Sequence, residues 1–126
     1  MAINRDPMME LDAQATNVYA HLFQALGDPT RLAVLQHLAN GEHRVRDLVE
    51  HIGLAQSTVS KHLSFLLECN LIAVRPDGRA SWYRLTEPEA TAALIGASEA
   101  LLLATGTQAR LRVHLHLPSS FGAGAS

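Results

Sequence analysis

The chain has 126 residues, the length of a single domain, with 48% hydrophobic and 17% charged residues. These proportions are typical of a folded globular protein and exclude an intrinsically disordered chain. No hydrophobic run approaches the roughly 20 residues that span a bilayer, and acidic residues interrupt the N-terminal segment, so we expect neither a membrane span nor a signal peptide and predict a cytoplasmic protein. Cys69 is the only cysteine, which excludes an intrachain disulfide and a Cys-x-x-Cys metal or redox pair.

The formal net charge is −2 at pH 7, but the charges are distributed unevenly along the chain. Residues 44–84 carry six basic side chains against four acidic ones, whereas residues 1–27 and 85–105 are net acidic. The basic groups of the middle segment are Arg44, Arg46, Lys61, Arg75, Arg79 and Arg84. A nucleic acid partner is therefore compatible with the acidic total.

We expect a flexible N-terminal arm over residues 1–9, one domain over residues 10–106 and a C-terminal tail over residues 107–126. Hydrophobic residues recur every three or four positions from Ala15 to Leu26, which predicts a first helix that ends at Gly27. Asp28 directly before Pro29 is typical of a helix start and predicts a second helix that runs through Leu38. A third, short helix fits residues 44–52.

Residues 55–71 are the most informative segment, because a helical wheel separates them into two chemically different faces. The stripe that we expect to be buried consists of Val59, Leu63, Leu66 and Leu67. The opposite stripe consists of Ser57, Ser60, Lys61, Ser64 and Glu68. A solvated helix face is usually richer in Glu and Lys, so these short hydroxyl side chains suggest a surface that forms hydrogen bonds within a groove.

Two β-prone runs in residues 72–85 surround Pro76, Asp77 and Gly78, which predicts a hairpin with Arg75 and Arg79 near its tip. Residues 87–105 predict a helix that is hydrophobic on nearly every face and must therefore be buried on more than one side. In so small a domain we expect the second surface to be another copy of the chain. The predicted dimer interface includes Leu22, Leu94, Ala97 and Leu101.

Together these elements predict a mainly α fold with a small β-hairpin, a winged helix-turn-helix that forms a homodimer through its terminal helices. In such a fold the second helix of the motif lies in the major groove of double-stranded DNA. The Gln56 amide suits an adenine edge, the serine hydroxyls suit bases or phosphates, and Lys61 suits guanine or phosphate. Arg79 on the wing suits the minor groove or a phosphate. We do not expect an enzyme, because no nucleophile with a paired base, glycine-rich phosphate loop or acid pair is present.

The strings FQALGDPTRLAVL, QSTVSKHLSFL and VRPDGRASWYRL closely resemble the ArsR/SmtB family of metal-sensing and stress-sensing repressors, over about residues 15–105. This resemblance implies a dimer that binds an imperfect palindromic operator and releases it when an effector binds. The DNA-binding residues that we expect are Gln56, Ser57, Thr58, Ser60, Lys61 and His62 in the recognition helix and Arg75 and Arg79 on the wing.

The effector is harder to predict, because the chain departs from the metal sites of the family that it resembles. Arg44-Val45-Arg46 stands where the family's arsenic and cadmium sensors have Cys-Val-Cys, and the site on the last helix retains only the acids Glu87 and Glu89. At a third kind of metal site in this family, Cys69 is the only cysteine ligand that the chain retains. His114 and His116 would face the same way on an extended strand, so we predict that these three residues hold a zinc, nickel, cobalt or cadmium ion.

Two alternatives remain open at this point. The first is the same fold responding to a non-metal signal, such as oxidation of Cys69, or to no effector at all. The second is a winged-helix module that binds another protein, although the polar stripe lacks the aromatic or aliphatic anchor that such a surface needs. Metal titration of the operator-binding protein separates the metal hypothesis from the first alternative.

Overall fold

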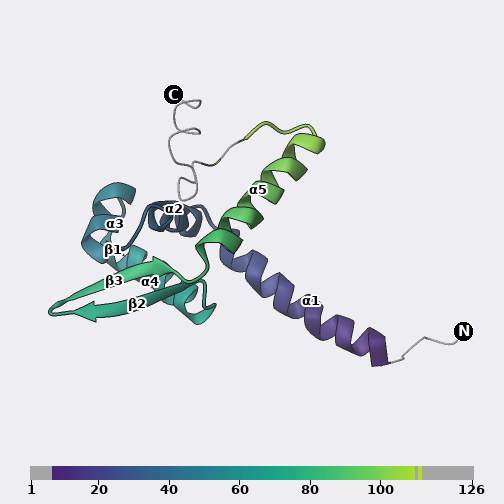
Figure 1. Cartoon of the computed structure of the whole chain (residues 1–126), viewed down its shortest axis with the longest axis horizontal. Coiled ribbons are helices and arrows are strands. Elements are labelled where there is room, and N and C mark those ends of the chain that lie inside the picture. The colour runs from purple at the N-terminus through teal and green to yellow at the C-terminus, as the bar shows by residue number, and fades with distance from the viewer. Residues whose placement is uncertain (1–6, 110, 112–126) are drawn as a thin grey trace, which may run out of the picture.

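The computed structural model describes residues 7–109 and 111, which form five helices and a small sheet (Figure 1). The elements run in the order α1 (Pro7–Leu26), α2 (Pro29–Leu38), β1 (His43–Arg44), α3 (Val45–Ile52), α4 (Gln56–Glu68), β2 (Ile72–Asp77), β3 (Ala80–Leu85) and α5 (Pro88–Ala104). The predicted mainly α architecture with a hairpin wing is confirmed.

The starts of α1 and α3 differ from the sequence prediction, and α5 is one residue shorter at each end. Helix α1 begins at Pro7, so residues 7–9, which we expected in the arm, form its first turn. Proline is well tolerated there because the first N–H groups of a helix have no intrahelical partner. The short helix expected over residues 44–52 begins one residue later, because His43 and Arg44 pair with β3 as a third strand.

The core lies where α2, α3 and α4 pack on the base of the hairpin. Its fully buried side chains include Val34 from α2, Leu48 from α3, and Val59, Leu63 and Leu66 from α4. Ile72 and Leu85, which pair across β2 and β3, close it from the sheet side. The buried stripe predicted for α4 is thereby confirmed, with Leu67 partly buried against the same cluster.

Local signals fix where the helices of this core begin and end. The Asp28 carboxylate accepts a hydrogen bond from the Arg31 backbone N–H at 3.0 Å, as expected for an N-cap. Gly53 ends α3 with a φ of 83°, a left-handed conformation that favours glycine. The turn from residue 53 to 55 then leads directly into α4, which completes the helix-turn-helix.

The wing is an antiparallel hairpin whose strands pair from Ile72 with Leu85 to Asp77 with Ala80. Its two-residue loop consists of Gly78, at a φ of 65°, and Arg79. Our expectation that Pro76 belongs to the turn is wrong, because Pro76 lies within β2 opposite Ser81. β2 is an edge strand in the sheet order β1-β3-β2, where proline's missing N–H can face outward without loss of a ladder bond.

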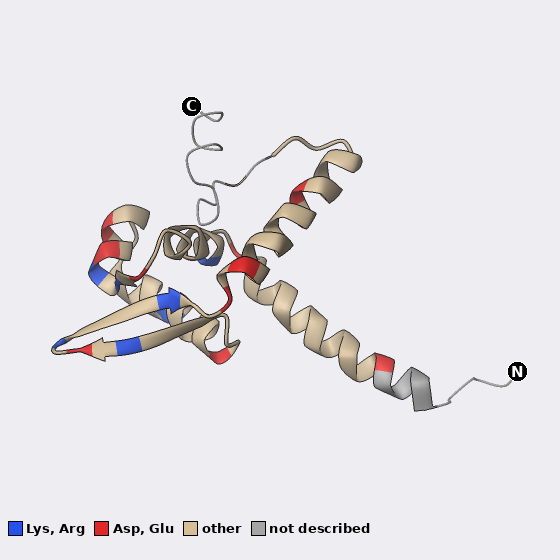
Figure 2. Cartoon of the chain, in the orientation of Figure 1, with Lys and Arg blue, Asp and Glu red and all other residues tan. Residues whose placement is uncertain are grey.

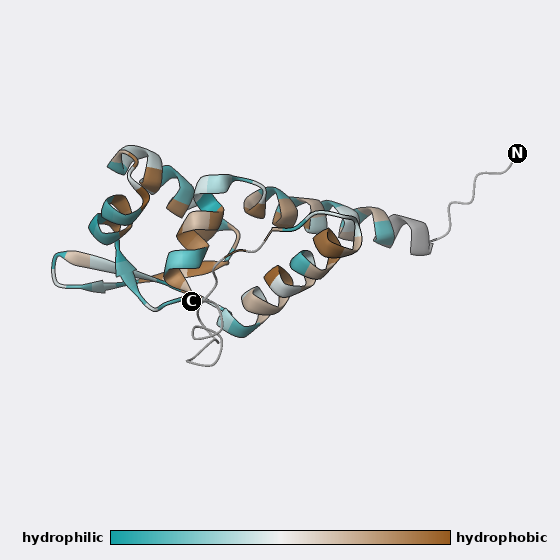
Figure 3. Cartoon of the chain, turned by 90° about the horizontal axis from the view of Figure 1, so that it is seen from above, coloured by the Kyte–Doolittle hydropathy of each residue, from teal (hydrophilic) through white to brown (hydrophobic). Residues whose placement is uncertain are grey.

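Helices α1 and α5 project from the core on the side away from the wing tip (Figure 1). No residue of α5 is buried, although the helix is hydrophobic along most of its length (Figure 3). On α1, Val18, Tyr19 and Phe23 are 68%, 64% and 52% exposed. Within the described part of the chain, no helix is both long and apolar enough to cross a membrane.

Candidate nucleic-acid interface

Helix α4 presents a polar stripe to solvent along its whole length. Gln56 and Ser57 in the first turn, then Lys61, Ser64 and Glu68, are all exposed. They lie opposite the buried stripe of Val59, Leu63 and Leu66, so one face of α4 packs on the core and the opposite face is open to solvent. This surface has the shape and the hydrogen-bonding groups that a recognition helix requires.

Three other residues predicted for this helix are less exposed. Thr58 and Ser60 are half-buried at the edges of the stripe. His62 turns toward α2, where its Nδ1 lies 3.2 Å from an Arg31 guanidinium nitrogen and 3.7 Å from an Asp28 carboxylate oxygen. The contact of His62 with Arg31 was not expected from the sequence.

A groove between the wing and the start of α3 adjoins the N-terminus of α4. Arg46, Gln56, Arg79 and Tyr83 are among its lining residues. Arg46 and Arg79 are exposed, and neither forms an ion pair with another described residue. Together with Lys61 they place three unneutralised cations on the helix-turn-helix and at this groove, a suitable set for a phosphate backbone.

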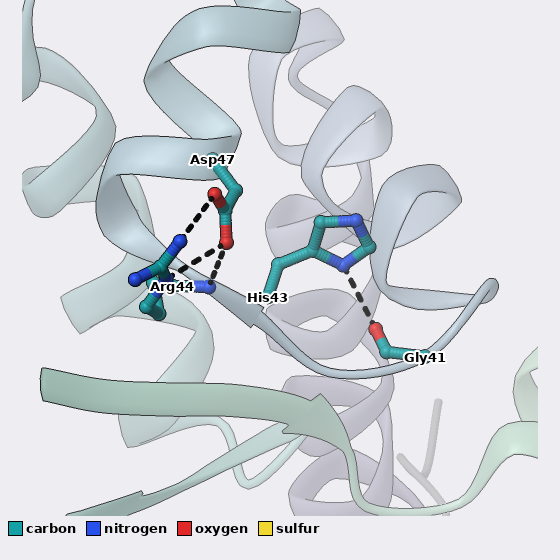
Figure 4. A network of polar contacts seen from close by, with 4 residues as sticks. All are labelled: Gly41, His43, Arg44 and Asp47. Carbon is teal, nitrogen blue, oxygen red and sulfur yellow. Dashed lines mark hydrogen bonds and ion pairs between the residues drawn. The ribbon is translucent and has the colours of Figure 1, made fainter. Parts of the chain in front are cut away.

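Arg46 was counted in the basic middle segment but not predicted as a site residue. Figure 2 shows basic side chains on the helix-turn-helix and the wing. The described charged residues of α1 and α5, in contrast, are all acidic. The neighbouring Arg44 is engaged within the chain. Its side chain contacts both carboxylate oxygens of Asp47, at 3.2 and 3.3 Å (Figure 4).

Arg75, which we predicted to bind DNA, also has a partner within the chain. Its guanidinium donates two hydrogen bonds to Glu42, at 2.8 and 2.9 Å, and lies over the Trp82 ring. The hydrogen-bonded Arg75 lowers the pKa of the Glu42 carboxyl and Glu42 raises that of Arg75. A DNA contact by Arg75 stays a prediction, and it would compete with this ion pair.

Of the predicted metal ligands, Cys69 is half-buried and His114 and His116 lie outside the described residues. The Cys69 sulfur lies 3.9 Å from Nδ1 of His21. Burial, together with the negative charge of Glu68, raises the pKa of the Cys69 thiol. Within residues 7–109 and 111, no group of three or more His, Cys, Asp or Glu side chains is positioned to hold a metal ion.

Three histidines from α2, β1 and α3 lie together. The rings of His37, His43 and His51 have centroid separations of 5.0 to 6.3 Å. Nδ1 of His43 lies 2.9 Å from the Gly41 carbonyl oxygen, as Figure 4 shows. Burial, and then repulsion by His51 and His43, lowers the pKa of His37. Local sequence patterns could not predict this cluster, because its members come from three different elements.

The predicted interface residues lie on the projecting helices. Leu22 and Leu94 are half-buried within one chain, whereas Ala97 and Leu101 are exposed. Leu101 is 65% exposed, and Val18, Tyr19 and Phe23 of α1 extend the uncovered apolar surface. These three α1 residues were recognised as the apolar face of a helix, but not as part of an interface.

Comparison with known proteins identifies the family. A model of the bacterial arsR family of regulatory proteins matches residues 28–74, from the N-cap of α2 into β2. A biofilm growth-associated repressor of Xylella fastidiosa is 36% identical over 93 residues, covering 74% of this chain and 81% of that protein. A probable mercury resistance operon repressor of Streptomyces lividans is 44% identical over 69 residues, and the chain spans only 55% of its length.

A solved structure agrees with the sequence matches. The crystal structure of the transcriptional repressor BigR from Xylella fastidiosa is 32% identical, with a TM-score of 0.60 over 76% of this chain and 96% of that one. The matched region contains the helix-turn-helix and wing described above. The chain belongs to the ArsR family of bacterial regulatory proteins, a family of DNA-binding transcriptional regulators and not of enzymes.

Proposed function

We propose that the chain is a homodimeric transcriptional repressor that inserts α4 into the major groove of a palindromic operator. The observation that carries this proposal is the exposed stripe of Gln56, Ser57, Lys61 and Ser64 above a buried row of valine and leucine. Hydroxyl, amide and ammonium groups are the donors and acceptors that base edges and phosphates recognise. The loop arginine Arg79 would lie over the adjacent backbone or minor groove.

Dimerisation is supported by the uncovered apolar faces of α1 and α5. An isolated chain would expose Tyr19, Phe23 and Leu101 to water, and burial of such side chains contributes roughly 25 cal/mol per Å². A twofold axis through these helices would give the two α4 helices the symmetry of a palindrome. The repressor would then act in the cytoplasm, where bacterial operators lie.

Fluorescence anisotropy with the DNA upstream of the chain's own gene tests the recognition surface. Ser57→Glu would place a carboxylate against phosphates, and we expect operator binding to fall at least a hundredfold while the dimer persists. Ser57→Thr keeps the hydroxyl and is the matched control. If Ser57→Glu binds the operator as tightly as the unaltered protein, α4 is not the recognition helix.

We propose a transition metal ion, of the class zinc, nickel, cobalt or cadmium, as the effector that releases the operator. The name of the Streptomyces lividans relative supports a metal response, and Cys69 with His114 and His116 supplies sulfur and nitrogen donors that such ions prefer. Titration of the protein–operator complex with each ion is the test. If none of the four changes operator affinity, the effector is not one of these metals.

Oxidation of Cys69 is the alternative effector mechanism, and the thiol's environment disfavours it. The raised pKa of Cys69 keeps the thiol protonated, whereas the thiolate is the reactive form. A protein-binding role is likewise less favoured, because the exposed stripe of α4 is polar throughout. Peroxide treatment followed by the same anisotropy assay separates a redox response from a metal response.

A further inference from the structure

A polar network centred on Arg31, in the first turn of α2, reaches α4. Its Nε donates to the carbonyl oxygen of Ala25 at 2.7 Å, and a terminal nitrogen donates to that of Gln24 at 2.8 Å. Both carbonyls lie in the last turn of α1, where a helix leaves its C=O groups without intrahelical partners. The guanidinium also lies 4.3 Å above the Phe65 ring of α4.

These contacts leave one terminal nitrogen of the guanidinium, and it lies 3.2 Å from Nδ1 of His62. Arginine remains protonated in proteins and carries only donors, so this contact requires Nδ1 of His62 to accept. That arrangement places the His62 ring proton on Nε2, in competition with the Asp28 carboxylate, whose oxygen lies 3.7 Å from the same Nδ1. Arg31 therefore selects one tautomer of the histidine on the recognition helix.

The Nε2 side of the ring is the part of His62 that a ligand can reach. No described residue forms a hydrogen bond with Nε2. Among the described residues, every buried side-chain nitrogen or oxygen has a hydrogen-bond partner, so Nε2, which has none, is not a buried atom. The His62 side chain is 20% exposed, so a small part of the ring faces solvent. An Nε2–H there is a donor suited to a phosphate oxygen or to N7 or O6 of a purine.

We propose that Arg31 is a positioning residue for DNA binding, which holds His62 as a rigid Nε2–H donor toward the operator. Three nitrogens and one face of the guanidinium are each engaged, so its orientation is over-determined. The same contacts join the end of α1 to α4, and the donor thereby keeps a fixed place relative to the dimer helices. This inference rests on the proposed function for its DNA ligand, but the tautomer does not depend on DNA.

Two measurements on the full chain test the proposal. Nitrogen-15 NMR of the free protein at neutral pH reports the His62 tautomer, and we expect Nε2–H to dominate in the unaltered protein and in a Phe65→Leu control. In Arg31→Gln, and in Arg31→Met if the first variant does not fold, the two tautomers should become mixed. A His62 that remains fully Nε2–H without the guanidinium, or that carries its proton on Nδ1 in the unaltered protein, overturns the proposal.

A double-mutant cycle on operator affinity supplies the second measurement. We expect the Arg31 variant to bind about tenfold more weakly than the unaltered protein, with dimerisation unchanged by light scattering. In a His62→Ala background the same Arg31 change should cost less than about twofold, because the donor that it positions is already absent. An undiminished loss in that background means that Arg31 does not act through His62. If the unaltered protein binds no operator, the proposed function fails, while the NMR result still decides the tautomer.

Discussion

The sharpest test of the DNA-binding surface is the salt dependence of Lys61→Gln. The exposed cations without an ion-pair partner among the described residues are Arg46, Lys61, Arg79 and Arg84. The first three lie on the helix-turn-helix and at the groove beside the wing, which makes six in a dimer. If each neutralises one phosphate, log K should fall with log salt at a slope of about −5.4. Removing Lys61 from both chains should make the slope shallower by about 1.8.

This difference is large enough to measure. Between about 50 and 200 mM salt, the unaltered dimer should lose affinity about twelvefold more than Lys61→Gln does. Fluorescence anisotropy over a salt series provides both slopes. Lys61→Arg should keep the original slope. Arg84→Gln should also keep it, because Arg84 alternates in β3 with Tyr83, which lines the groove, and points to the opposite face. A Lys61→Gln slope equal to that of the unaltered protein would show that Lys61 contacts no phosphate.

Four further predictions concern assembly and stability. Leu101→Lys should yield monomers in sedimentation and weaken operator binding, since Leu101 is 65% exposed in one chain; a variant that stays dimeric contradicts the interface. Leu66→Ala, at a fully buried position, should lower the free energy of unfolding in urea by roughly 3 kcal/mol, and a loss below about 1 kcal/mol would mean that the core is less tightly packed. Asp28→Ala should cost about 1 kcal/mol by removing the α2 cap, whereas Asp28→Asn should restore most of it. The lowered pKa of His37 favours the neutral ring in the folded state, so the free energy of unfolding should fall as the pH drops below 6.5. This fall should be less steep in His51→Gln; equal slopes for the two proteins would show that His51 does not repel a charge on His37.

The helices and their buried faces were predictable because their signals are local. A period of 3.6 residues sorts Val59, Leu63 and Leu66 to one side of α4 and Ser57 and Lys61 to the other, whatever the rest of the chain does. The N-cap at residue 28 and the left-handed glycine at residue 53 likewise depend on a few neighbouring residues. The uneven charge distribution of the sequence is also present in the fold, because residues 44–84, the basic segment, form one contiguous part of the structure (Figure 2).

What the sequence could not predict depends on contacts between distant positions. The strand β1 consists of two residues and is defined only by its pairing with β3. Arg31 meets His62 across 31 positions, and Glu42 meets Arg75 across 33, so neither pair follows any local period. The hairpin prediction placed Arg75 near the tip of the wing, but it could not show that the Glu42 carboxylate binds this side chain. The apolar character of α5 predicted an interface. The contacts within that interface cannot be derived from one chain, because they involve residues of the second copy.

The edge of the wing has a consequence for the protein's behaviour at high concentration. Asp77 and Ala80 close a two-residue loop and so form a hydrogen-bonded pair, which makes Pro76 and Ser81 a non-bonded pair whose backbone groups face away from one another. The open rim of β2 therefore lacks a donor at Pro76, and charged side chains flank it on both sides. A strand from a neighbouring molecule cannot extend the sheet there, so crowded copies should resist edge-to-edge aggregation through their wings.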